Sequence, residues 1–246
     1  MRVWEARSAR NLEILRAPGF FFDVVHSTGA NNPNLKRYVD APAEVGTNIS
    51  GNHWNRGNLQ KCVHAFIGYD KNKTVAVANI LPYDICCWGC GKGSKGSYNY
   101  KPAYAQFEIC EDGLKDSVYF NDAFGVAIEY CAYLCKEYGI PVKNIVSHSE
   151  AHGKGYASNH GDCDHWLSKH GKDMAWFRQQ VQALLDKPEE PEVNYQCIHT
   201  VVKGDSYWKL AKTYLGKGSR YKEIMQLNGK TSTALYVGDQ IKIPKK

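Results

Sequence analysis

A short segment late in the chain concentrates side chains that bind metals or transfer protons. Residues 148–165 contain four of the nine histidines, together with three carboxylates and a thiol. These are His148, Glu150, His152, His160, Asp162, Cys163, Asp164 and His165. A catalytic zinc takes three protein ligands of these types and leaves one position open to water. The segment therefore predicts a zinc site built from two histidines and one Asp or Cys, with a polar surface loop as the alternative.

Two histidines stand at the ends of apolar, strand-like runs. His26 closes the run Phe-Phe-Phe-Asp-Val-Val-His and precedes a Ser-Thr-Gly turn, and His148 closes the run Ile-Val-Ser-His. Alternating and β-branched apolar residues of this kind are typical of strands. We expect the two strands to bring both imidazoles to one edge of a sheet.

Spacing alone does not select the ligands within residues 148–165. His148 and His152 are four residues apart and would share a helical face, but Glu150 does not stand where a His-Glu-x-x-His motif requires it. Gly153 and Gly155 also disfavour a continuing helix. We therefore reject the zincin interpretation, and Asp162, Cys163 and Asp164 stay open as third ligands.

A single carboxylate, Glu108, interrupts the apolar strand pattern of residues 105–110. A buried carboxylate is costly unless it is paired or has a function, and here it could orient or deprotonate an attacking water. Cys86, Cys87 and Cys90 suggest a structural zinc only weakly, because no second cysteine pair follows at the required spacing. Cys131 and Cys135 fit small buried core residues.

The elements expected to position these residues define an α/β fold. Strand-like runs at residues 20–26, 63–68, 74–78 and 104–110 alternate with helical stretches, which predicts a mixed central sheet flanked by helices. One helix is expected over residues 121–138, with Asn121 or Asp122 as its cap and Gly139 at its end. Another is expected over residues 172–186.

The chain also contains a boundary between two domains. Residues 187–192 read Lys-Pro-Glu-Glu-Pro-Glu, which is typical of a linker. We expect a catalytic domain at residues 1–186, a linker at residues 187–196 and a small domain at residues 197–246. The small domain carries nine Lys and one Arg against three acidic residues.

The pattern of the small domain predicts a βααβ order. The expected strands cover residues 198–202 and 240–243, with helices that begin after Ser206 and Ser219.

Composition limits the remaining possibilities. With 246 residues, 43% hydrophobic and 23% charged, the chain is neither disordered nor collagen-like. It has no apolar run long enough to cross a bilayer and no standard secretory signal, so we expect cytoplasmic synthesis and reduced thiols.

Three motifs together resemble the type 2 N-acetylmuramoyl-L-alanine amidases, a family that includes many phage endolysins and bacterial autolysins. They are Cys-Val-His-Ala-Phe-Ile-Gly at residues 62–68, Phe-Glu-Ile-Cys-Glu at residues 107–111, and residues 148–162. The resemblance extends over residues 15–185. Two positions depart from it: Gly89 follows Trp88 where the family usually has a histidine, and Ala105-Gln106 replaces a common Ile-Gly pair.

The resemblance implies a zinc in a surface groove, with His26, His148 and Asp162 as ligands. It further implies that His160 stabilises the developing oxyanion and that Glu108 acts on the water. The bond cleaved would be the amide between N-acetylmuramic acid and L-alanine in peptidoglycan.

The tail resembles a LysM domain over its full length, from His199 to Pro244. LysM modules bind glycans that contain N-acetylglucosamine. The expected binding residues are Gly204, Asp205, Ser206, Tyr207 and Tyr236. Tethering to the wall would raise the local concentration of substrate near the zinc. No nucleic-acid-binding motif accompanies the basic charge.

Together these features predict a zinc-dependent peptidoglycan hydrolase held on the cell wall by LysM. Release through a phage holin would fit the missing signal, and a bacterial autolysin is the other origin considered. The alternatives are a peptidoglycan-binding protein without catalysis and a wall hydrolase that cuts another bond. A muramidase needs a pair of carboxylates, and Glu108 has no evident partner in the sequence.

Overall fold

The computed structural model describes residues 1, 3–5, 20–40, 43–54, 56, 59–83, 85–99, 103–187 and 195–245. The chain divides into two compact units, Met1–Lys187 and Pro188–Lys246. Most of the expected linker lies outside the described residues, and its last two residues belong to the first strand of the second unit. None of the described helices is both long enough and apolar enough to span a bilayer.

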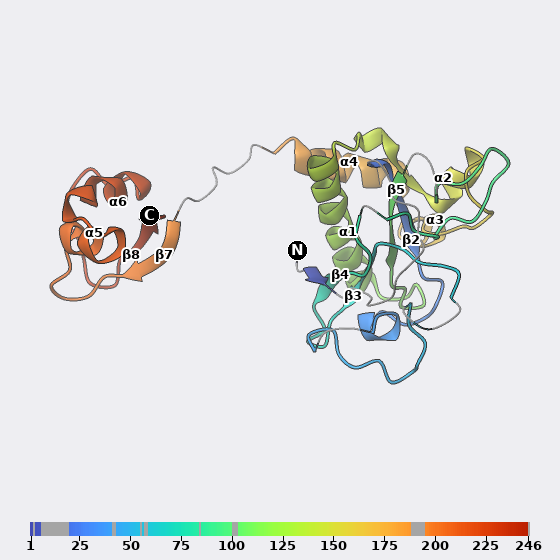
Figure 1. Ribbon diagram of the computed structural model, residues 1–246, viewed down its shortest axis with the longest axis horizontal. Coiled ribbons are helices and arrows are strands. Elements are labelled where there is room, and N and C mark those ends of the chain that lie inside the picture. Colours follow the sequence, from blue (N-terminus) through green and yellow to red (C-terminus); the bar gives the residue numbers. More distant parts are fainter. Residues whose placement is uncertain are drawn as a thin grey trace. The chain divides into compact units, whose positions relative to one another are not determined.

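The first unit is built around a six-stranded mixed sheet (Figure 1). Its strands are β1 (Val3–Glu5), β2 (Phe20–Ser27), β3 (Ala65–Tyr69), β4 (Val75–Asn79), β5 (Ala103–Ile109) and β6 (Ile145–Ser147). Their order across the sheet is β1-β4-β3-β5-β2-β6, and only the β3–β4 pair is antiparallel. The expected mixed α/β fold is confirmed.

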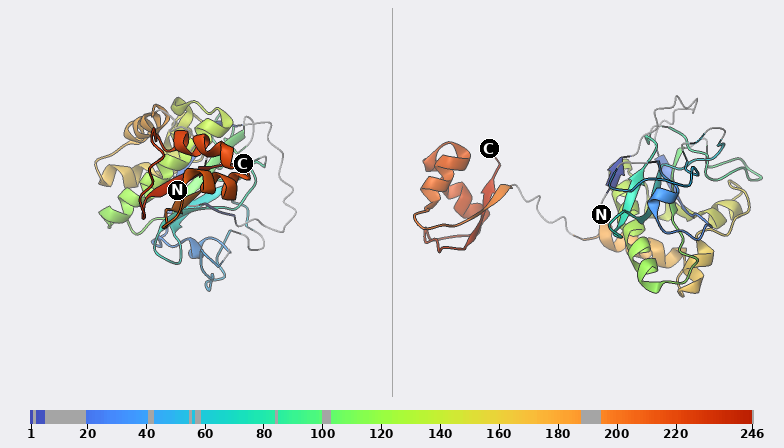
Figure 2. Two further views of the ribbon diagram at one scale, coloured as in Figure 1. Left: turned by 90° about the vertical axis from the view of Figure 1, so that its left-hand side faces the viewer. Right: turned by 90° about the horizontal axis from the view of Figure 1, so that it is seen from below.

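The helices of the first unit differ greatly in length. They are α1 (Ser117–Tyr138), α2 (His148–Gly153), α3 (Asp164–Lys169) and α4 (Met174–Leu185), with 3-10 turns at Leu35–Arg37 and Val142–Asn144. The two long helices, α1 and α4, pack against each other on one side of the sheet (Figures 1 and 2).

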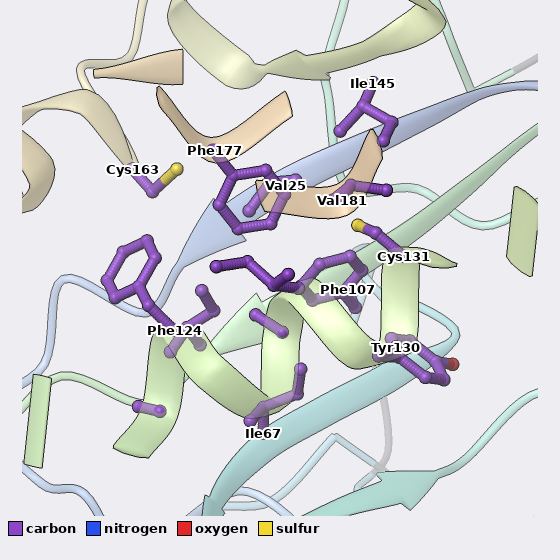
Figure 3. Close-up of a cluster of buried hydrophobic side chains, with 14 of the residues drawn as sticks. Val25, Ile67, Phe107, Phe124, Tyr130, Cys131, Ile145, Cys163, Phe177 and Val181 are labelled. Carbon is purple, nitrogen blue, oxygen red and sulfur yellow. The ribbon is translucent and has the colours of Figure 1, made fainter. Parts of the chain in front are cut away.

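Successive side chains along each strand point to opposite faces of the sheet. One face packs in the main hydrophobic core, and the other carries the candidate site residues. Val25 and Phe107 point toward α1 and α4 and pack with Phe124 and Phe177 in the main core (Figure 3). Because successive strand residues face opposite sides, the even-numbered His26 and Glu108 lie on the other face. The same rule places Gln106 beside them.

The longest helix starts earlier than the sequence predicted. Asp116 caps α1 by accepting hydrogen bonds from the Val118 and Tyr119 amides, so the prediction of Asn121 or Asp122 as the cap is wrong. The helix gains a first turn in which Tyr119 and Phe120 are buried, and that burial extends it upstream. Gly139 ends the helix with φ 66°, as expected.

The second unit has the expected βααβ order. Its elements are β7 (Tyr195–Thr200), α5 (Tyr207–Leu215), a 3-10 turn (Gly218–Arg220), α6 (Tyr221–Leu227) and β8 (Gln240–Pro244). Ser206 caps α5 by accepting from the Lys209 amide. Ser219 does not cap α6, because it lies inside the 3-10 turn that leads into the helix without a side-chain cap.

Candidate metal centre and active site

The first histidine of the site stands near the end of an interior strand of the sheet. His26 lies on β2, between β5 and β6, and its Cα pairs with that of Glu108 on β5. Its side chain is 1% exposed. The strand pairs with β5 at His26 itself and with β6 up to Val25, which holds this imidazole in a fixed position.

His148 is the first residue of α2 and not the last of a strand. Ser147 and Glu150 form a capping box at this helix start, which fixes the direction in which His148 leaves the sheet edge. Arg178 of α4 donates two hydrogen bonds to the Glu150 carboxylate, at 2.7 and 3.0 Å. It also donates to the Ile145 carbonyl, so α4 ties β6 to α2.

The loop that carries Asp162 is fastened to the ends of two strands. Glu111, which follows β5 and is 4% exposed, accepts from the Ser27 hydroxyl at 2.6 Å. Its Oε1 lies 3.0 Å from His165 Nε2 on α3. These contacts bring the loop before α3 close to His26.

His26, His148 and Asp162 converge at one point. The distances are 3.0 Å between the two Nδ1 atoms, 3.1 Å from His26 Nδ1 to Asp162 Oδ2, and 3.6 Å from His148 Nδ1 to the same oxygen. Ligands about 2.0–2.1 Å from a tetrahedral zinc are separated by about 3.3 Å. Among the residues that the structure describes, this is the one group of His, Cys, Asp and Glu with spacing suited to a metal ion.

The second nitrogen of each imidazole is engaged behind the cluster. His26 Nε2 lies 3.0 Å from Gln106 Oε1, and His148 Nε2 lies 3.3 Å from Ser158 Oγ. The Ser158 hydroxyl donates to the Cys90 carbonyl, which leaves its oxygen free to accept from His148. In its neutral form, each imidazole would therefore carry its proton on Nε2 and direct a lone pair from Nδ1 toward the cluster.

Two lone pairs and a carboxylate facing one another suit a cation. Although burial alone would raise it, the hydrogen bonds with His148 and His26 hold the pKa of Asp162 well below its ordinary value. Burial alone would lower the pKa of His26, but the contact with Asp162 raises it well above the usual value. Without a metal, a bound proton supplies the positive charge that stabilises the Asp162 carboxylate. The donor set thus fits a zinc ion.

Glu108 lies beside the cluster with one carboxylate oxygen, Oε2, buried and without a hydrogen-bond partner. Burial raises its pKa from 4.5 to about 7, and His26 offsets part of that effect. Glu108 also lines a cavity of about 340 Å³. The wall includes Arg37, Tyr38, Trp54, Lys61 and Trp88. A carboxyl with a pKa near 7, open to a cavity, can accept and return a proton at neutral pH.

His160 lies at the outer side of the cluster. Its ring stacks on His148 with centroids 4.8 Å apart, and its Nδ1 is 3.7 Å from Asp162 Oδ1. The side chain is 62% exposed, so it can reach a bound substrate.

Cys163 and Asp164, the other candidates for the third ligand, and the remaining residues singled out in the sequence lie outside the cluster. Cys163 is buried in the main core, with its Sγ 3.9 Å from Met174 Sδ. Burial raises the pKa of Asp164, and its carboxylate forms a hydrogen bond with Ser147. His152 contacts the Ala157 carbonyl. Cys86, Cys87 and Cys90 are buried free thiols outside the metal-compatible group.

Several supporting residues are missed by reasoning from the sequence. Gln106, Ser158, Glu111 and Arg178 hold the cluster from behind but belong to no metal-binding motif. Only Gln106 carries a local signal, because it is a polar residue inside an apolar strand.

In the second unit, the predicted sugar-binding residues divide into two groups. Tyr236 is 72% exposed and Gly204 adopts φ 93° in an open turn. The Asp205 carboxylate accepts from the Val202 amide and pairs with His199 Nε2, both of which stabilise the turn. Tyr207 is 2% exposed and packs in the core of the unit, because it starts the buried face of α5. The prediction that Tyr207 takes part in glycan binding stays a prediction, and a buried side chain limits that role to its backbone.

Structural comparison finds the same fold in several solved structures. The hydrolase AmiA of Staphylococcus aureus, in complex with its ligand, matches with a TM-score of 0.56 and 16% identity over 75% of this chain and 83% of its own. A mutant of PlyL matches at 0.53 and 17%, covering 74% of this chain and 99% of its own. The PlyG catalytic domain matches at 0.52 and 19%, covering 78% and 99%. At these identities the likeness shows the fold.

Comparison with family profiles identifies both units. Residues 199–244 match the LysM domain, and residues 22–165 match the N-acetylmuramoyl-L-alanine amidase family. None of the curated proteins gives a significant match. The amidase match covers more than half of the chain and contains His26, His148 and Asp162, so the chain belongs to the N-acetylmuramoyl-L-alanine amidase family.

Proposed function

We propose that the protein is a zinc-dependent amidase that hydrolyses the bond between N-acetylmuramic acid and L-alanine in peptidoglycan. The observation that carries the proposal is the triangle of His26, His148 and Asp162 beside the unpartnered carboxylate of Glu108. It supplies a metal site and a proton acceptor within one site.

The three ligands have separate tasks in this proposal. His26 and His148 offer neutral nitrogens, and Asp162 supplies the negative charge that compensates a divalent ion. When bound, zinc supplies a Lewis acid that polarises the scissile carbonyl and acidifies water.

Glu108 moves the proton in this scheme. Its unpartnered oxygen accepts a proton from the attacking water as the new carbon–oxygen bond forms. The same carboxyl then gives that proton to the L-alanine nitrogen as the carbon–nitrogen bond breaks. A pKa of about 7 suits both directions of transfer near neutral pH.

His160 completes the site from the solvent side. Its exposed ring stands next to Asp162 and can donate a hydrogen bond to the oxyanion that develops on the scissile carbonyl. The adjoining cavity, with Trp54 and Trp88 in its wall, would hold the substrate against Glu108.

The second unit is proposed to retain the enzyme on the wall. Tyr236, together with the exposed turn at Gly204, offers a surface for an N-acetylglucosamine-containing glycan. A tether of this kind raises the effective substrate concentration without any contact to the reacting bond. The enzyme would act at the bacterial wall after release during lysis.

The test is the chemistry of the new ends in digested peptidoglycan. We expect mass spectrometry to find free L-alanine amino termini and no new reducing sugar ends. Glu108→Gln is the matched control, because it removes the proton acceptor while the ligands stay. New reducing ends would support a muramidase instead. A wild-type protein that retains zinc and binds the wall without cutting it would support the non-catalytic alternative.

A further inference from the structure

A buried glutamine stands directly behind the first histidine. Gln106 on β5 is 0% exposed, and its Oε1 lies 3.0 Å from His26 Nε2. The same oxygen accepts from Cys90 Sγ at 3.0 Å. The amide group therefore touches the imidazole on the side opposite the metal site.

The hydrogen-bond partners fix which way this amide points. Gln106 Nε2 lies 3.2 Å from Asn99 Oδ1 and 3.4 Å from the Tyr98 carbonyl. The carbonyl can only accept, and Asn99 Oδ1 already accepts from the Cys90 amide at 2.9 Å. The NH2 group must face these acceptors, so Oε1 faces His26.

We infer that Gln106 is a positioning residue that prepares His26 for zinc. Because Gln106 Oε1 can only accept, it holds the imidazole proton on Nε2 and leaves the Nδ1 lone pair facing His148 and Asp162. The inference rests on the zinc site of the proposed function.

Gly89 packs against the side chain of Gln106. A Cβ atom at Gly89 would lie well inside van der Waals contact with Gln106 Oε1 and within 3.1 Å of Val63 Cγ1. The glutamine side chain thus occupies the room that a side chain at position 89 would need. Gly89 and the Gln106 side chain therefore fit together sterically.

The experiment measures zinc affinity of the full chain by competition with a chelating dye, for wild type and five variants. Gln106→Met keeps the size and removes the acceptor, so we expect zinc affinity to fall by about 10- to 100-fold. Gly89→Ala should produce a loss in the same range by displacing the glutamine. Combining Gln106→Met with Gly89→Ala should add little to either loss, because both act on one contact.

Two further variants separate positioning from packing. Gln106→Glu keeps an acceptor oxygen and should retain zinc affinity within about threefold, even if its urea midpoint falls. Cys90→Ala removes the other donor to the same oxygen, together with an Sγ that lies 3.8 Å from His26 Nε2, and leaves the Gln106–His26 hydrogen bond in place. Zinc affinity should therefore stay within about threefold.

The results distinguish failure of this inference from failure of the proposed function. Wild-type zinc affinity in folded Gln106→Met or Gly89→Ala overturns the inference and leaves the proposed amidase intact. An equal loss in Cys90→Ala also overturns it, since general packing would then explain the effect. If the wild type binds no zinc, the proposed function itself fails.

Discussion

Replacing Glu108 with glutamine should stabilise the metal-free protein while it abolishes hydrolysis. In the folded chain burial raises the pKa of Glu108 from 4.5 to about 7, and its Oε2 has no hydrogen-bond partner. Because the folded state holds this proton more tightly than the unfolded state, Glu108 favours folding below about pH 4.5 and loses that contribution as the pH rises through 7. Glutamine cannot ionise and is insensitive to this change.

The size of the effect follows from the pKa difference. Each pKa unit corresponds to about 1.4 kcal/mol, so the ceiling is about 3 kcal/mol, and partial contact of the side chain with the cavity reduces it to about 2 kcal/mol. The free energy of unfolding of Glu108→Gln, relative to wild type, should therefore rise by about 2 kcal/mol between pH 4.5 and pH 8.

Urea unfolding in the presence of a chelator measures this difference. A Trp208→Phe background confines tryptophan fluorescence to the first unit, because the other five tryptophans precede the second one. A difference between variant and wild type that is constant across this pH range, or that falls with pH, would refute the argument that Glu108 is a buried, unpaired carboxyl.

Four other changes test separate parts of the structure. Asp23→Asn removes a fully buried carboxyl whose pKa is raised to about 7, so its stability relative to wild type should increase from pH 4 to pH 8 in urea unfolding, while zinc affinity stays unchanged. His160→Ala should lower kcat by about 10²- to 10³-fold without loss of zinc in a dye assay. Arg178→Met breaks the bidentate pair with Glu150 and should cost about 1–2 kcal/mol in urea unfolding of the first unit. Ser206→Ala removes the cap of α5 and should cost about 1 kcal/mol in unfolding of the second unit, followed by Trp208 fluorescence.

The candidate ligands could be identified in the sequence because their signals are local. His26 and His148 follow apolar runs, and Glu108 interrupts one, so each is visible as a break in a periodic pattern. Asp162 is different, since Cys163 and Asp164 have equally suitable side chains. The backbone direction at the start of α3 decides between them by turning Cys163 into the core.

The supporting contacts could not be predicted, because they join distant parts of the chain. Arg178 reaches Glu150 across 28 residues, and Gln106 reaches His26 across 80. The helix starts were misjudged for a related reason. Asp116 and Asp122 have the same capping chemistry, and only the burial of Tyr119 and Phe120 in the tertiary structure selects the earlier one.

Metal content of the purified full chain, measured beside its cleavage of peptidoglycan, tests the zinc centre most directly. We expect one zinc per wild-type chain, and none in folded His26→Ala or Asp162→Ala. Release of L-alanine amino termini should stop when a chelator removes the ion and return when zinc is restored. Undiminished cleavage by metal-free protein, or by either variant, would contradict a reaction that depends on these ligands.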